Sequence, residues 1–173
     1  MLQQTANTIN HINRILGISV SYATILMALV TCTIVVLRYG FNLGWIAMQE
    51  SVMYLHAAVF LLGSAYTYQH NAHVRVDVFY RQFSERKKAW VNLFGSLLFM
   101  LPVSLYIGII CFDYVLDSWR LLEGSREPGG LPFVYILKSF LLLFAISLVL
   151  QAISDIICQG LKLAGAQAKQ EAR

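Results

Sequence analysis

Four long apolar stretches constrain this chain more than any other feature of its sequence. They cover residues 15–37, 45–68, 90–116 and 133–158, and the first contains no charged residue. At about 1.5 Å per residue, each stretch is long enough as a helix to cross a hydrocarbon core of roughly 30 Å. Hydrophobic residues make up 58% of the chain and charged residues 13%, which is about half the charged share of a soluble domain. The sequence therefore predicts an all-α membrane protein with four transmembrane helices in a single integral membrane domain, residues 1–173.

Apolar residues also recur at helical spacing before the first stretch. They are Leu2, Ile9, Ile12 and Leu16, with polar residues between them. This pattern predicts a short amphipathic lead-in helix that lies on the membrane surface. The first stretch is longer than the core of a secretory signal, and no clean cleavage site follows it, so we expect a retained helix.

A second interfacial helix is predicted between the second and third stretches. Its apolar stripe consists of Val76, Phe79, Tyr80 and Phe83. Asp77 is placed to cap or start this helix, and Ser84 is placed to cap the helix that leads into the third span. The alternation of Val74, Val76 and Val78 also permits a short extended entry, which leaves the start of the helix open. Pro102 lies near the middle of that span and predicts a kink, because proline removes one backbone hydrogen bond.

The basic residues are distributed unevenly between the two sides of the predicted spans. Nine of the thirteen lie before span 1, between spans 2 and 3, or after span 4: Arg14, Arg75, Arg81, Arg86, Lys87, Lys88, Lys162, Lys169 and Arg173. Because basic residues stay in the cytoplasm during insertion, both termini are predicted to be cytoplasmic, with 38–44 and 117–132 facing outward. This distribution accounts for the net charge of +4 without a nucleic-acid partner.

Glu50 and Lys138 are the charged residues that stand out within the spans. Each lies about five residues from the outer end of its span, roughly 8 Å deep, on a face of small residues that lets another helix approach. An unpaired charge at the bilayer centre costs on the order of 2.5–3.5 kcal/mol. We therefore expect Glu50 to pair with Lys138 or, across the first hairpin, with Arg38. A docking contact to another subunit and an ion or proton site are the alternatives.

The sequence carries no catalytic or metal-binding motif. It has no nucleophile elbow, zinc-protease helix or phosphate-binding glycine loop, so we predict no enzyme activity, no cofactor and no metal. The cysteines at 32, 111 and 158 form no C-x-x-C pair and are expected to be buried thiols, which argues against a thiol oxidoreductase. His56 has no second histidine at its depth, so we expect a hydrogen-bonded polar side chain and not a haem ligand.

Several short motifs follow one another in order along the four spans. They are Arg38-Tyr39-Gly40-Phe41-Asn42, Trp45, Glu50, Gly63, His73-Val74-Arg75-Val76-Asp77, Glu127-Pro128-Gly129-Gly130-Leu131-Pro132, Lys138 and Gln151. This ordered set resembles the small membrane subunit, of the DctQ type, of tripartite ATP-independent periplasmic (TRAP) transporters. The resemblance covers nearly the whole chain.

The resemblance implies a bacterial inner-membrane protein that works with partners. Such subunits bind a large membrane subunit of the DctM type, which carries the substrate and sodium sites. A periplasmic binding protein delivers an organic acid, such as a C4-dicarboxylate or sialic acid. In this chain the resemblance implies a scaffold role, with interface or topology anchors at Trp45, His73, Arg75 and Asp77. It also implies a docking loop for the binding protein, formed by Glu123, Arg126, Glu127, Pro128, Gly129 and Gly130.

A small stand-alone exporter that uses Glu50 to couple transport to protons is the alternative function. It requires Glu50 near the middle of the bilayer and a homodimer. Glu50 is predicted to lie nearer the outer surface, and basic residues are available to pair with it. The spans also lack the interrupted helices that usually build ion and substrate sites.

Overall fold

The computed structural model describes residues 1–74 and 78–171, with side chains as far as Gly165. In the described residues, four helical segments are long and apolar enough to span a membrane: Leu2–Gly40, Ile46–Gln69, Glu85–Leu121 and Val134–Gly165. Each segment contains its predicted stretch, except that the second and fourth segments begin one residue later than predicted. The prediction of an all-α membrane protein with four spanning helices is confirmed.

The second and third spanning segments are each built from more than one element. The elements in chain order are α1 (Leu2–Gly40), α2 (Ile46–Leu62), α3 (Ser64–Gln69), the 3₁₀ turn η1 (Tyr80–Gln82), α4 (Glu85–Gly95), the π turn η2 (Ser96–Met100), α5 (Leu101–Arg120) and α6 (Val134–Glu171). Only Gly63 separates α2 from α3, whereas α4, η2 and α5 follow one another directly.

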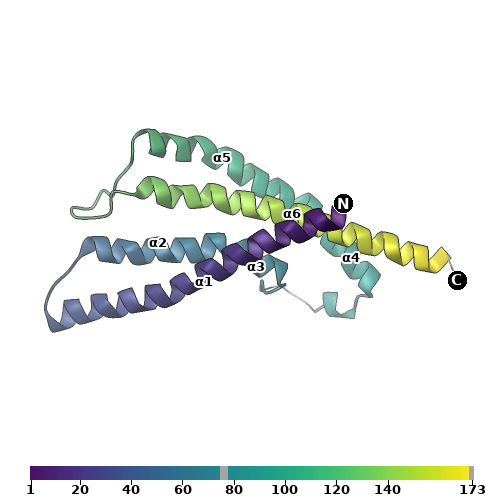
Figure 1. Cartoon of the computed structure of the whole chain (residues 1–173), viewed down its shortest axis with the longest axis horizontal. Helices are drawn as coiled ribbons and strands as arrows, with labels where there is room; N and C mark the ends of the chain where they lie inside the picture. The colour runs from purple at the N-terminus through teal and green to yellow at the C-terminus, as the bar shows by residue number, and fades with distance from the viewer. Residues whose placement is uncertain (75–77, 172–173) are drawn as a thin grey trace.

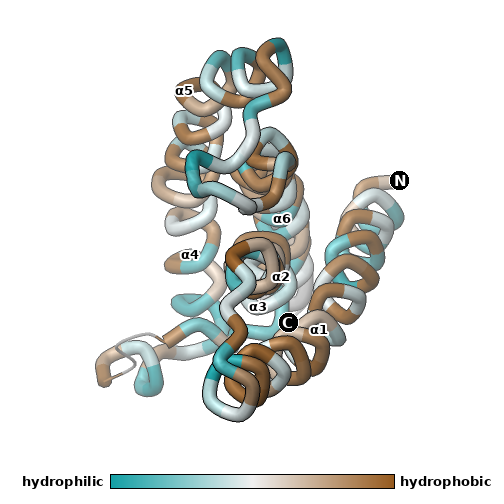
Figure 2. The backbone as a smooth tube through the Cα atoms, turned by 90° about the vertical axis from the view of Figure 1, so that its left-hand side faces the viewer, coloured by the Kyte–Doolittle hydropathy of each residue, from teal (hydrophilic) through white to brown (hydrophobic). Residues whose placement is uncertain are grey.

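Helix α6 is the centre of the arrangement. It packs against α1, α2 and α3 as well as against α4 and α5. Figure 1 shows the α1–α2 and α5–α6 hairpins side by side, with their connecting segments at the left. We call that side the hairpin end (residues 41–45 and 121–133) and the opposite side the terminal end. Seen from the hairpin end in Figure 2, α5 and α1 lie at opposite edges, with α6 and α2 between them.

The predicted lead-in continues the first span without a break. α1 runs as one helix of 39 residues from Leu2 to Gly40. Its buried residues are Ala6, Ile9, Asn13 and Gly17, which recur at the three- and four-residue spacing of a single helix face. Leu2 and Ile12 are exposed. The buried face packs on the rest of the protein, and a position on the membrane surface remains a prediction.

The interfacial segment between the second and third spans is shorter than predicted. The described part contains a 3₁₀ turn at Tyr80–Gln82, after which Phe83 is extended. Ser84 then caps α4, since its Oγ accepts a hydrogen bond of 3.4 Å from the amide of Lys87. An extended Phe83 is incompatible with an α-helix continuing into the cap, so the prediction of a helix through 83 is wrong. The predicted start at Asp77 lies outside the described residues.

Pro102 lies in the first turn of α5, directly after the π turn. Proline has no amide hydrogen and its ring crowds the carbonyl four residues earlier, so the regular α-helical ladder cannot continue through this position. The preceding turn is therefore the wider π form, which membrane helices tolerate where packing satisfies the freed groups.

Candidate functional site

Glu50, the fifth residue of α2, holds the connection between α5 and α6. One carboxylate oxygen accepts a hydrogen bond from Ser125 Oγ, and the other accepts one of 2.6 Å from the amide of Leu131. The loop also closes on itself, since the amide of Ser125 donates to the carbonyl of Leu131 at 2.9 Å. Glu50 therefore ties the hairpin end of α2 to both sides of the 121–133 loop.

Glycine is required at the point where this loop approaches Glu50. A Cβ added at Gly130 would lie 2.4 Å from Ser125 Oγ and 2.8 Å from the Glu50 carboxylate, too close for any side chain. Gly129 has a φ of +79°, in the left-handed region that favours glycine. The Gly129-Gly130 pair thus lets the loop bend back and its backbone reach the carboxylate.

Lys138 of α6 forms an ion pair with Glu123 of the same loop. The Nζ–Oε2 distance is 2.5 Å, and the side chains are 13% and 29% exposed. Ser118 Oγ donates a second hydrogen bond of 2.7 Å to this carboxylate, and the Lys138 ammonium lies 3.8 Å from the centre of the Tyr114 ring. The hydrogen bonds from Lys138 and Ser118 lower the pKa of the Glu123 carboxyl below its ordinary value.

The predicted pairing of Glu50 with Lys138 or Arg38 is wrong. Lys138 bonds to Glu123, and Glu50 bonds to the loop. Arg38 is exposed at the hairpin end of α1 and forms no ion pair with any described residue. The reason is the course of the 121–133 loop, which folds back over the helix ends. It brings the Ser125 hydroxyl and the Leu131 amide to Glu50, and the Glu123 carboxylate to Lys138.

The other predicted site residues lie at both ends of the protein. Trp45 precedes the first turn of α2 and is exposed, and a ring nitrogen of His73 lies 3.2 Å from the carbonyl oxygen of Ser64. Arg75 and Asp77 lie outside the described residues. The tip of the loop is exposed at four successive positions: Arg126, Glu127, Pro128 and Gly129.

A buried amide cluster joins α1 to α6 near the terminal end. Asn13 Nδ2 donates to Gln151 Oε1 at 2.8 Å, and Gln151 Nε2 donates to Asn10 Oδ1 at 3.3 Å. Ser154 Oγ donates to the same Asn10 oxygen at 2.8 Å. Asn13, Gln151 and Ser154 are buried, so these bonds satisfy polar groups that would otherwise be costly inside the packed helices.

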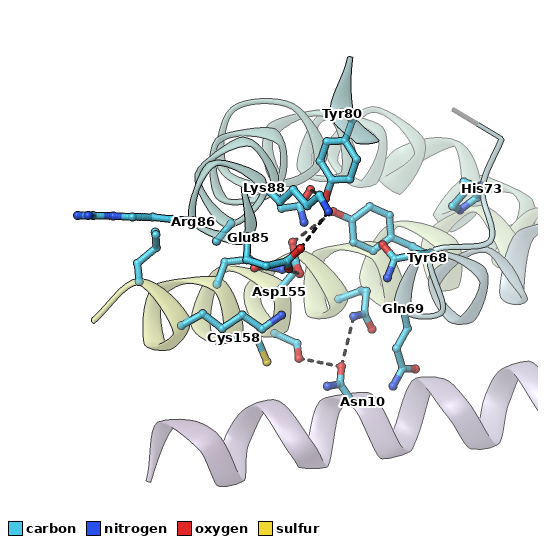
Figure 3. A pocket seen from close by; sticks show the side chains of 18 residues that line it. Asn10, Tyr68, Gln69, His73, Tyr80, Glu85, Arg86, Lys88, Asp155 and Cys158 are labelled. Atoms are coloured by element: carbon cyan, nitrogen blue, oxygen red, sulfur yellow. Dashed lines mark hydrogen bonds and ion pairs between the residues drawn. The ribbon is translucent and has the colours of Figure 1, made fainter. Parts of the chain in front are cut away.

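Asp155 lies one residue beyond Ser154 on α6 and joins α6 to two more elements, α3 and the π turn. Its carboxylate accepts hydrogen bonds from Ser96 Oγ of the π turn at 2.6 Å, from the Tyr68 hydroxyl at 3.3 Å and from Gln159 Nε2 at 2.9 Å. Tyr68, Asp155 and Gln159 form one wall of an open pocket of about 840 Å³. Figure 3 shows Tyr68 and Asp155 meeting on this wall, with Asn10 of α1 across from them.

This second cluster was not predicted from the sequence. Gln151 entered only as part of a motif, and the acidic residue at 155 was overlooked although it lies inside an apolar stretch. The four-residue step from Gln151 to Asp155, with polar Ser154 beside it, was the available signal for a polar face on α6. Asn10 and Asn13, three residues apart on α1, were the matching signal on the partner helix.

Two expectations about isolated residues were wrong. Cys32 is exposed on α1 and not buried, while Cys111 and Cys158 are partly buried. His56 is exposed on α2, where its ring stacks on Phe60 at a centroid distance of 6.2 Å. Within the described residues no group of three His, Cys, Asp or Glu side chains could hold a metal ion.

The fold and these clusters define a multi-pass membrane protein whose polar side chains brace its helices and its loop. The family model for the DctQ component of tripartite ATP-independent periplasmic transporters matches residues 27–160, which is most of the chain. The chain therefore belongs to the DctQ family, the small membrane subunits of TRAP transporters, and is a transporter component and not an enzyme. The resemblance inferred from the motifs is confirmed.

A protein of Haemophilus influenzae named "Putative TRAP transporter small permease protein" is similar over nearly its full length. It is 29% identical over 156 residues, which cover 90% of this chain and 94% of the relative. No solved structure matches the chain.

Proposed function

We propose that this chain is the scaffold subunit of a sodium-driven transporter that takes up an organic acid of the C4-dicarboxylate or sialic acid class. In this role it braces a large membrane subunit of the DctM type in the bacterial inner membrane. Its termini lie in the cytoplasm, and its hairpin end faces the periplasm, where the 121–133 loop helps to dock the binding protein.

The observation that carries this proposal is the attachment of the loop to Glu50. The carboxylate of Glu50 bonds to Ser125 and to the Leu131 amide, so the loop has a defined shape before any partner binds. The exposed loop tip presents one positive and one negative side chain, Arg126 and Glu127. A preorganised loop loses less conformational entropy on binding than a mobile one, which suits a docking contact.

A scaffold role is supported by the distribution of polar groups within the spans. Glu50 and Lys138 are each engaged by groups of this same chain. Asp155 is likewise held by three donors. Charges held in this way brace helices, whereas the alternative exporter would require Glu50 itself to be free to exchange its proton. The geometry of Glu50 therefore favours the scaffold over the stand-alone exporter.

Reconstitution in lipid vesicles tests the proposal. Vesicles that contain this chain, its cognate large subunit and the binding protein should accumulate a labelled C4-dicarboxylate or sialic acid when sodium is higher outside. Vesicles without this chain should show little uptake. Proton-driven export by vesicles that contain this chain alone would support the exporter instead.

A reporter-fusion scan tests the orientation separately. Fusions of an enzyme that is active only in the periplasm should be active after Gly129 and inactive after Arg81 and at the C-terminus. Activity after Arg81 would reverse the proposed topology.

A further inference from the structure

Asp113 lies on the side of α5 that faces away from the rest of the protein. The face of α5 that packs toward α6 contains Ser104, Gly108, Cys111, Val115 and Ser118, all buried or partly buried. A Cβ added at Gly108 would lie 3.4 Å from the Ala145 Cβ, which places this face against α6. At 3.6 residues per turn, Asp113 points about 180° away from the centre of that face.

The surroundings of Asp113 are apolar and exposed. Tyr106, Ile109 and Ile110 lie on the same side of the helix, and the first two are 64% and 72% exposed. We call these three residues and Asp113 the α5 edge. Figures 1 and 2 both show α5 at the margin of the helices, with its outer side uncovered.

The carboxylate of Asp113 has no partner within the described residues. It forms no hydrogen bond or ion pair there, whereas Asp117, one turn further along, pairs with Arg120 at 3.0 Å. Asp113 is also well inside the span. Its neighbour Tyr114 contacts the Lys138 ammonium, and Arg120 at the end of α5 lies about 10 Å further along the helix.

Glu50 and Lys138, which also lie in the outer part of the spans, differ from Asp113 because both are held by groups of the same chain. A carboxylate exposed on a spanning helix is unfavourable in hydrocarbon and is found facing protein or paired with a donor. The α5 edge therefore lacks a cationic or strongly donating group that another helix would supply.

We propose that the α5 edge docks against a spanning helix of the large membrane subunit, and that a lysine or arginine of that helix pairs with Asp113. This inference rests on the proposed scaffold function and names the surface that carries it. A second copy of this chain is a poor occupant, because a twofold axis through this edge would bring two Asp113 carboxylates together. The flanking tyrosine and isoleucines supply the apolar contact around the ion pair.

Co-purification with the co-expressed cognate large subunit tests the proposal. The variants Asp113→Leu and Asp113→Lys should retain about tenfold less large subunit than the wild type. Asp113→Glu, which keeps the charge, should retain it. Asp117→Asn and His56→Leu are matched controls that change polar side chains elsewhere and should bind normally. Full retention by Asp113→Leu and Asp113→Lys, or loss with His56→Leu alone, would overturn the α5 edge as the docking face.

Two further measurements separate docking from folding and from the function itself. The isolated Asp113→Leu subunit should melt at or above the wild-type temperature, because the change removes an exposed charge; a large fall would assign Asp113 a folding role. A photoreactive residue in place of Ile109 should crosslink to the large subunit. Crosslinks to a second copy of this chain or to lipid alone would overturn the inference. If the wild type retained no large subunit, the scaffold function itself would fail.

Discussion

The amide of Leu131 donates a hydrogen bond of 2.6 Å to the carboxylate of Glu50, which lies 81 positions earlier in the chain. Together with the bond from Ser125, it joins the first helical hairpin to the loop of the second. An acidic side chain inside a span is thus occupied in holding a loop, and its two oxygens have defined donors.

Replacing Glu50 with Gln should loosen the loop without unfolding the helices. The amide of Gln has only one oxygen, so either Ser125 or the Leu131 amide loses its acceptor. Because the loop loses one of its two bonds to Glu50, hydrogen–deuterium exchange in the 125–131 segment should become faster, by roughly tenfold.

Asp117→Asn is the control for the Glu50 variant. It removes a carboxylate from the same end of the protein, and that carboxylate pairs with Arg120 and not with the loop. Exchange in the loop should match the wild type. Equal protection of the loop in the Glu50→Gln protein would show that Glu50 does not hold it.

Reversing the charges of Glu123 and Lys138 should distinguish the observed ion pair from the one expected from the sequence. Either single reversal places like charges together and should lower the melting temperature of the protein. The double reversal Glu123→Lys with Lys138→Glu should recover part of this loss. The double reversal of Glu50 and Lys138 should recover nothing, because these two side chains bond to different partners. Thermal unfolding in detergent measures all of these effects.

The same ion pair predicts how stability depends on pH. The pKa of Glu123 is lowered in the folded protein by the hydrogen bonds from Lys138 and Ser118. A lowered carboxyl pKa contributes stability above the unfolded value, and this contribution is lost as the pH falls through the folded value. The wild type should therefore melt above Glu123→Gln at neutral pH, and the difference should shrink below about pH 4. A difference that grows on acidification would contradict the assignment.

The spans could be predicted from the sequence because the bilayer imposes a length that apolar runs must match. The hydrogen-bond donors to Glu50 could not be predicted in this way. One of its donors is the backbone amide of Leu131, a group that every residue except proline carries and that no sequence pattern marks. Its position depends on how the 121–133 loop bends at Gly129 and Gly130, which is a property of the folded loop.

The terminal-end cluster illustrates a second limit. The partners of Asp155 include Ser96 and Tyr68, which are 59 and 87 positions away. No sequence pattern marks Ser96 or Tyr68 as a partner of Asp155. The three residues meet only because α3, the π turn and α6 pack together. The family could nevertheless be recognised, because ordered motifs along the chain do not require knowledge of which residues touch.

The bond between Ser96 and Asp155 should contribute measurably to stability. In a double-mutant cycle with Ser96→Ala and Asp155→Asn, we expect a coupling of about 1–2 kcal/mol, since one partner is charged and the site is inside the packed helices. Ser104→Ala is a matched control. Ser104 is also buried, but its hydroxyl donates only to backbone carbonyls of its own helix. If the coupling free energy between Ser104 and Asp155 were as large as that between Ser96 and Asp155, the coupling would come from general packing and not from the hydrogen bond.

Gly17 provides the most direct test of how α1 meets α3. A Cβ added at Gly17 would lie 2.3 Å from both Cβ and Cγ of Tyr66. Because a Cβ cannot rotate away, Gly17→Ala must push the two helices apart and should lower stability by about 1–3 kcal/mol. Combining it with Tyr66→Ala should give little rescue, since the Cβ of residue 66 remains. Gly40→Ala has open space around it and should melt like the wild type. If Gly17→Ala melted as the wild type does, the close contact between α1 and α3 would be wrong.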